Sequence, residues 1–182
     1  MPKIPPQRAD IFEEEVRFRA SVSEFVGNKI GASVNFINER QIYDKQFFLN
    51  GPYSIFSPPL LGVDGGLGLL FDAEIVGVLF FNLVKGTSGF TRFDVRRFTG
   101  PNSPPGGTSI FSVKPELASS QPQNAYAIKN FVTTTNVVTG PWATMPTLAI
   151  QNLNAGDFLV FDILAAQSGA ENCGLVLYFR PR

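Results

Sequence analysis

The chain has 182 residues, with 15 basic and 15 acidic side chains and no histidine. Zero net charge argues against a protein that binds nucleic acid by neutralising phosphates, and the lack of histidine excludes histidine-dependent catalytic triads and histidine-ligated zinc or haem. An apolar fraction of 44% is enough for a core, whereas charged residues make up 16%, against roughly 25% in average domains. We therefore expect other copies or a partner to cover part of the surface.

The first 45 residues differ in composition from the rest, since they carry 14 of the 30 charged side chains. Asp10 is placed to cap a helix, and the glutamate run at 13–15 suits the positive end of a helix dipole. Apolar residues then recur at spacings of three and four, which predicts an amphipathic helix. We assign residues 1–45 to an N-terminal arm for anchoring or oligomerisation. Its expected partner or anchor interface consists of Phe12, Val16, Phe18, Val22 and Phe25.

Residues 46–182 are expected to form an all-β body, because apolar and alternating runs are separated by turns rich in glycine and proline. No helical period lies between these runs, which disfavours a parallel sheet with crossover helices. The predicted fold class is mainly β: an antiparallel β-sandwich or jelly roll with a short helical N-terminal arm. The predicted strands lie at 47–50, 67–71, 74–84, 91–98, 109–112, 131–138, 147–153, 158–165 and 175–180.

The segment 74–84 is unusual because both of its alternating faces are apolar. An antiparallel strand in a sandwich normally has one face in water, so here the second face needs a cover. The arm or a long loop of the same chain is one candidate. The favoured alternative is a subunit interface between three jelly rolls packed around an axis. In this interpretation Val76, Val78 and Phe80 line the subunit interface, while Leu79 and Phe81 fill the sandwich.

Motifs for catalysis or ligand binding are weak in this sequence. The glycine-rich run 62–68 lacks the lysine and hydroxyl residue of a P-loop, so it predicts a turn entering a strand. Two carboxylate pairs, Asp72 with Glu74 and Asp157 with Asp162, are of the type used in sugar hydrolysis or calcium binding. Neither pair lies in a loop dense in ligands. We therefore expect no catalytic residue, no cofactor and no metal.

The remaining features also favour structural roles. Arg92, Arg96 and Arg97 form a basic cluster on an alternating strand, which predicts a solvated or interface face and no nucleic-acid partner. The single cysteine, Cys173, is expected to be a buried small apolar residue. The longest apolar run, 75–84, is far shorter than the ~20 residues of a membrane helix, so no membrane partner is expected.

Several runs in the body share the order of a known family. Residues 86–95 match the pattern Gly-x-Ser-Gly-x-Thr-x-x-Asp-Val. They are followed by GGTSIFSVKP at 106–115, LNAGDFLVFDI at 153–163 and LVLYF at 175–179. In this order the runs resemble the jelly-roll modules of tailed-bacteriophage virion proteins, found in head decorations, head fibres and tail fibres. The resemblance covers roughly residues 65–180, and its motifs mark turns and strand starts.

The resemblance implies a non-enzymatic structural protein of the virion, assembled in the host cytoplasm. The expected form is a homotrimeric capsid decoration or cement protein, whose arm docks on the major capsid protein or other virion proteins. A short arm and a single module without a fibre shaft favour this form. The alternative is a tail, baseplate or head-fibre protein with a glycan receptor-binding jelly roll. An enzyme of the depolymerase class has no positive support in the sequence.

Overall fold

The structure is a computed structural model that describes residues 42–52, 59–100 and 106–182. Within these ranges all strand pairings are antiparallel and no helix is present. The predicted antiparallel β-sandwich is therefore confirmed for the body. The predicted helix, with Phe12, Val16, Phe18, Val22 and Phe25, lies outside the described residues.

Eight of the described strands form the two layers of the sandwich, and six further strands have two or three residues each. Four of these six extend the layers, and the other two pair with each other as a separate small sheet. The layer strands are β1 (Tyr43–Pro52), β2 (Leu60–Gly68), β3 (Ala73–Val84), β4 (Phe90–Phe98), β7 (Glu116–Ala118), β8 (Ala125–Asn130), β13 (Phe158–Ala165) and β14 (Glu171–Pro181). The shorter strands are β5 (Thr108–Ser109), β6 (Phe111–Val113), β9 (Asn136–Val138), β10 (Ala143–Thr144), β11 (Thr147–Leu148) and β12 (Asn152–Leu153).

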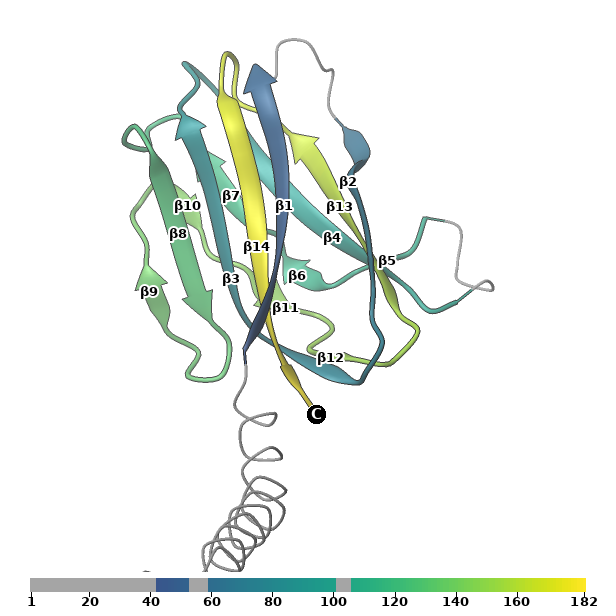
Figure 1. Cartoon of the computed structure of the whole chain (residues 1–182). Coiled ribbons are helices and arrows are strands. Elements are labelled where there is room, and N and C mark those ends of the chain that lie inside the picture. The colour runs from purple at the N-terminus through teal and green to yellow at the C-terminus, as the bar shows by residue number, and fades with distance from the viewer. Residues whose placement is uncertain (1–41, 53–58, 101–105) are drawn as a thin grey trace, which may run out of the picture. The chain divides into compact units, whose positions relative to one another are not determined.

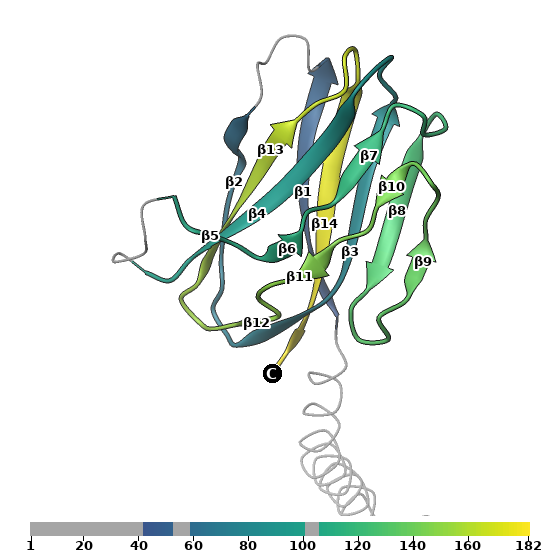
Figure 2. The ribbon, with the colours of Figure 1, turned by 180° about the vertical axis from the view of Figure 1, so that it is seen from behind.

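The strand order is that of a jelly roll. Sheet A, in front in Figure 1, has the order β1-β14-β3-β8-β9 with β12 beside β3. Sheet B, in front in Figure 2, has the order β10-β7-β4-β13-β2 with β5 beside β4. Among the eight layer strands, the first therefore pairs with the last, β2 with β13, β3 with β8 and β4 with β7. This nested pairing defines the jelly roll.

An aromatic ladder ties the two sheets together through the core. Phe47 of β1 stacks on Phe161 of β13, with ring centroids 5.4 Å apart, and Phe161 lies 6.1 Å from Phe93 of β4. Phe80 of β3 meets the Phe93 ring edge-on at 6.2 Å. All four side chains are fully buried. Such pairs add about 0.5–1.5 kcal/mol each beyond the burial of their area, so the ladder fixes how the layers pack.

Strand β1 begins at Tyr43, so the last residues of the segment expected to be the arm, 43–45, belong to a strand. The chain divides into residues 1–41 and 42–182. The functional division into an anchoring arm and a jelly-roll body stays a prediction.

The loop at 86–89 connects the two layers and does not close a hairpin, because β3 belongs to sheet A and β4 to sheet B. The Gly86 N–H donates a 2.8 Å hydrogen bond to the buried side-chain oxygen of Gln167, which fixes the crossing. The segment 115–123 differs from the sequence prediction, which places no strand between 112 and 131. This segment contains β7, whose Leu117 is fully buried.

The predicted strand at 131–138 is mostly a turn, and β8 lies before it. The Asn130 side-chain oxygen accepts hydrogen bonds from the N–H groups of Val132 and Thr133, at 2.9 and 3.0 Å. Thr134 then adopts a positive φ of 56°. An asparagine turn of this kind overrides the strand preference of valine and threonine. Only the end of the run remains extended, as β9.

Candidate functional site

The outer face of sheet A carries an apolar surface that crosses four strands. Residues opposite each other in antiparallel strands share a face, so the registers of β1, β14, β3 and β8 place their side chains in rows. One row contains Phe48, Gly174, Phe81 and Tyr126. The neighbouring row contains Gln46, Val176, Leu79 and Ile128.

A glycine makes close aromatic packing possible in the first row. The rings of Phe48 and Phe81 lie 5.8 Å apart across β14, at an interplanar angle of 29°. The strand between them presents Gly174, and a Cβ there would lie 2.6 Å from the Phe81 ring and 2.6 Å from the backbone oxygen of Phe47. Only glycine therefore lets the two rings approach over β14.

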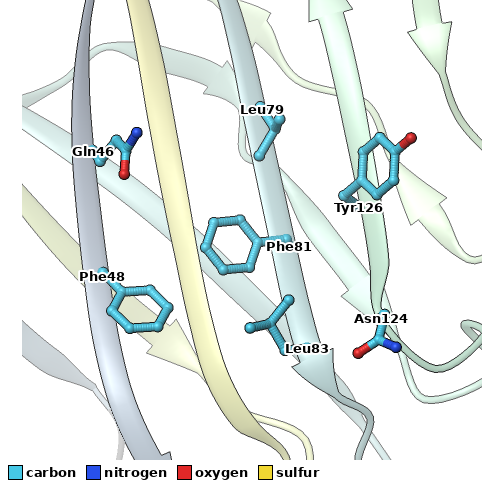
Figure 3. Close-up of a pocket in the computed structure, with 7 residues that line it drawn as sticks. All are labelled: Gln46, Phe48, Leu79, Phe81, Leu83, Asn124 and Tyr126. Carbon is cyan, nitrogen blue, oxygen red and sulfur yellow. The ribbon is translucent and has the colours of Figure 1, made fainter.

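These rows enclose a shallow groove of about 460 Å³, shown in Figure 3. Phe48, Leu83 and Tyr126 remain 38%, 39% and 47% exposed, although they are large apolar or aromatic side chains. We define the sheet A face as the seven residues that line the groove: Gln46, Phe48, Leu79, Phe81, Leu83, Asn124 and Tyr126.

The chemistry of the sheet A face is that of a contact surface. None of its seven side chains carries a charge at neutral pH, and its polar groups are the amides of Gln46 and Asn124 and the Tyr126 hydroxyl. Such groups donate and accept hydrogen bonds at the margin of an apolar area. The face is therefore suited to burying apolar surface against another molecule.

Two of the three predicted interface residues lie on the other side of β3. Val78 and Phe80 are fully buried in the core between the sheets, whereas Leu79 and Phe81 lie on the outer face. The predicted face assignment is therefore wrong and has to be inverted. A subunit interface on this strand would involve Leu79 and Phe81.

A β-bulge explains why the alternation misleads. In β3 the register skips Val76, because Ile75 pairs with Phe179 while Gly77 pairs with the adjacent Tyr178. The bulge places Ile75 and Val78, three residues apart, in the same core. Val76 is nearly buried but does not belong to the core cluster. Its backbone oxygen accepts a hydrogen bond from the N–H of Phe131.

The sequence-predicted carboxylate pairs are held by other groups. Glu74 pairs with Arg180 at 2.6 Å, and Asp72 accepts a hydrogen bond from the Ala155 N–H at 2.9 Å. Asp157 pairs with Arg97 at 2.8 Å. Asp162 is buried and accepts a hydrogen bond from the Arg96 guanidinium. These carboxylates therefore position backbone and arginine side chains.

The predicted basic cluster is neutralised in the same way. Arg92 pairs with Glu116 at 2.6 Å, and Arg96 and Arg97 pair with the aspartates already described. Cys173 is fully buried, as expected for a small apolar residue. In the part of the chain that the structure describes, no group of histidine, cysteine or carboxylate side chains is arranged to hold a metal ion. No helix in that part is long and apolar enough to cross a membrane.

No protein-family model matches this chain, and no curated protein sequence matches it. Among solved structures, the chain is similar to Eiger TNF from S. frugiperda, with 11% identity and a TM-score of 0.39, over 75% of this chain and 85% of that one. It is also similar to a structure of the infectious bursal disease virus Gx strain, with 10% identity and a TM-score of 0.28. That match covers 78% of this chain and 33% of the viral chain. Likenesses of this size identify neither a family nor a function.

Proposed function

We propose that the chain is a non-enzymatic structural protein of a bacteriophage particle: a homotrimeric capsid decoration or cement protein. Its subunits meet through the sheet A face, and its N-terminal arm docks on the major capsid protein or another virion protein. The observation that carries the proposal is the uncharged apolar sheet A face on a jelly roll. The order of the sequence runs at 86–95, 106–115, 153–163 and 175–179 supports the virion assignment.

The composition of the sheet A face supports association with further copies of the chain. Burying one large apolar side chain contributes roughly 1.5–3 kcal/mol, and this face presents several of them side by side. An apolar centre with polar groups at its margin is the anatomy of a subunit interface. A second copy is the occupant we favour, because every copy carries the same face and closed symmetry buries all of them at once.

Light scattering on the purified chain tests the oligomer. We expect about three times the chain mass of 19.9 kDa at micromolar concentration. Leu79→Asp should give a folded monomer, because it places a charge at the centre of the interface. The matched control is Leu61→Asp, which makes the same change at a leucine of sheet B that is 60% exposed, and it should remain trimeric. A stable monomer for the unsubstituted chain would refute the interface.

The arm accounts for docking in this proposal. Its apolar stripe of Phe12, Val16, Phe18, Val22 and Phe25 would bind the particle, and three copies would strengthen binding through their effective concentration. A chain that begins at Ile42 should therefore stay folded and trimeric but fail to bind particles assembled without the protein. If it binds them with near-normal affinity, the body holds the anchor. If it is monomeric, the arm is a trimerisation element.

The same face favours one second candidate, a glycan-binding tail or head-fibre module. Three aromatic side chains, Phe48, Phe81 and Tyr126, lie near the amides of Gln46 and Asn124, and aromatic rings with a few directed polar groups are typical of ligand sites. A glycan array distinguishes the two candidates. Specific binding that is lost in Tyr126→Ala would favour the fibre module, whereas a trimer without glycan binding would favour the cement protein.

A further inference from the structure

The turn between β2 and β3 is held firmly at both ends. The Leu69 N–H donates to the Asp157 oxygen at 2.9 Å, and the Leu69 oxygen accepts from the Gly156 N–H at 2.8 Å. Asp72 is held twice: its side chain accepts from the Ala155 N–H at 2.9 Å, and its backbone oxygen from the Arg182 N–H at 3.0 Å. The β12–β13 turn and the C-terminal residue therefore fix the backbone on either side of the tip.

The tip of this firmly held turn is apolar and exposed. Leu70 is 92% exposed and Phe71 is 42% exposed. The Phe71 ring lies 5.6 Å from the ring of Tyr43, which is preceded by Ile42, itself 61% exposed. We define the foot patch as Ile42, Tyr43, Leu70 and Phe71. A rigid apolar projection loses little conformational entropy when it binds, so this geometry suits docking.

The foot patch is separate from the sheet A face. Along β1, Phe48 and Gln46 point to the outer face of sheet A, whereas Tyr43 lies an odd number of residues from both and has the phase of the core residue Phe47. Beside Tyr43 and Phe71 lies a groove of about 200 Å³, which Leu67, Leu69 and Phe179 also line. The patch lies at the end of the sandwich where the chain ends (Figure 1).

The covalent chain points to the occupant. Residues 1–41 join the described body at Ile42, which is itself part of the foot patch. Whatever protein the arm binds is therefore tethered to the body through a residue of this patch, which raises its effective concentration at the patch. We propose that the foot patch is a second docking element, which seats in an apolar recess of the same protein surface that the arm binds. This inference rests on the anchoring role proposed above.

The experiment uses the full chain and cosedimentation with particles assembled without it. Leu70→Ser should weaken binding about 10- to 100-fold, because one buried leucine side chain is lost from the contact. The control is Leu61→Ser, which makes the same change at the far end of β2 and should bind normally. Both variants should stay trimeric and keep the melting temperature of the unsubstituted chain. Because the foot-patch contact is apolar, the fold-loss caused by Leu70→Ser should be nearly the same at low and high salt.

The outcomes separate this inference from the proposed function. If the unsubstituted chain binds and Leu70→Ser binds equally well, the foot patch is not a docking element and the anchoring role stands. If the unsubstituted chain does not bind the particles, both fall. If Leu70→Ser dissociates the trimer, the occupant is a second copy of this chain and the docking inference is overturned.

Discussion

The outer faces of the two sheets differ in where their charged side chains lie, although both belong to the same sandwich. The sheet A face carries no charged side chain and presents half-exposed aromatic rings. On the outer side of sheet B, Arg92 pairs with Glu116, Asp94 lies 3.4 Å from Lys114, and Arg96 pairs with Asp162. The segment 106–115 also lies against this sheet, since Arg96 donates to the Gly106 oxygen and Ser109 to Asp94 at 2.5 Å.

The chain itself supplies partners for the charged groups on the outer side of sheet B, whereas it leaves the sheet A face open. On sheet B, ion pairs and hydrogen bonds with the segment 106–115 give these polar groups partners within the same chain. On sheet A, half-exposed Phe48, Leu83 and Tyr126 line a groove that no described segment covers. Changes on the open face should therefore act on association, and changes on the outer side of sheet B on folding.

The largest effect is expected when a charge is placed on the core side of β3 and compared with a charge on its outer side. Val78→Asp should prevent folding, because an unpaired carboxylate in the core costs several kcal/mol out of a total stability of about 5–15 kcal/mol. Leu79→Asp, one residue on, should fold normally and dissociate. Circular dichroism and light scattering on both variants check this. Identical behaviour of the two would mean that sheet A has no free face.

The next effect concerns a buried charge on sheet B. Asp162 is fully buried and accepts hydrogen bonds from Arg96 and from the Gly62 N–H, the latter at 2.8 Å. Asp162→Ala leaves the arginine without its partner, and removing one member of a buried pair costs about 3–5 kcal/mol. Because Arg96 remains 19% exposed, we expect the lower end of this range.

Urea unfolding measures this loss, and Glu116→Ala is its control. The Arg92–Glu116 pair is exposed at both ends, by 38% and 21%, so its loss should cost about 1 kcal/mol or less. Equal losses in the two variants would show that burial does not set the strength of the pairs on sheet B.

A smaller effect is expected for Gly174→Ala, which tests how the sheet A face is built. The added methyl group would meet the Phe81 ring and the Phe47 backbone oxygen, both at 2.6 Å, and overpacking of this kind costs about 1–3 kcal/mol. Because Phe81 must move, the trimer should also dissociate at a higher concentration than normal. Thermal unfolding and dilution experiments measure the two effects.

Gly68→Ala is the matched control for this prediction. It lies in a strand of sheet B, and its added Cβ would have an ordinary 3.9 Å contact with Phe158. Its cost in stability should be small, and the trimer should be unaffected. A loss of trimer in the control would mean that sheet B also takes part in the interface.

Much of the fold could be predicted from the sequence, because period-two patterns and turn residues are local signals. The strands β3, β4, β13 and β14 lie close to their predicted positions. Strand β8 lies before the predicted strand at 131–138. The hydrogen bonds of the Asn130 side chain decide where β8 ends, and they do not depend on the hydrophobic pattern. The pairing of first and last strands follows from no local signal.

The candidate site could be located but not oriented. Both faces of 74–84 are apolar in β3 as well, one in the core and one on the outer side of sheet A, yet alternation alone does not tell which face is which. The bulge at Val76 then changes the phase within the strand. The foot patch could not be predicted from the sequence, because Leu70 and Phe71 lie at the end of the apolar strand predicted at 67–71. Their exposure depends on the distant Asp157 and Arg182, which hold the turn.

The smallest effect concerns the pH dependence of the outer side of sheet B. Burial raises the pKa of the Asp94 carboxyl above its ordinary value of 3.8, and this effect exceeds the lowering by Ser109, Lys114 and the Val95 N–H. Asp162 lies directly opposite Asp94 in the register of β13 and β4, and Arg96 is the other charged side chain nearby. The protonated form is therefore favoured by folding. The contribution of the protonated Asp94 carboxyl to the free energy of unfolding is present below about pH 4 and is lost as the pH rises through the raised pKa.

Asp94→Asn should remove this loss. The asparagine oxygen can still accept the hydrogen bonds from Ser109 and the Val95 N–H, which now occupy the carboxylate at 2.5 and 2.9 Å. The free energy of unfolding, measured in urea from pH 4 to pH 7, should therefore fall less with rising pH in the variant than in the unsubstituted chain. Lys114→Gln should do the reverse, because it removes a cation that stabilises the ionised carboxyl. If both variants keep the original pH profile, the Asp94 carboxyl is as well solvated folded as unfolded, and the outer side of sheet B is more open to water than its ion pairs indicate.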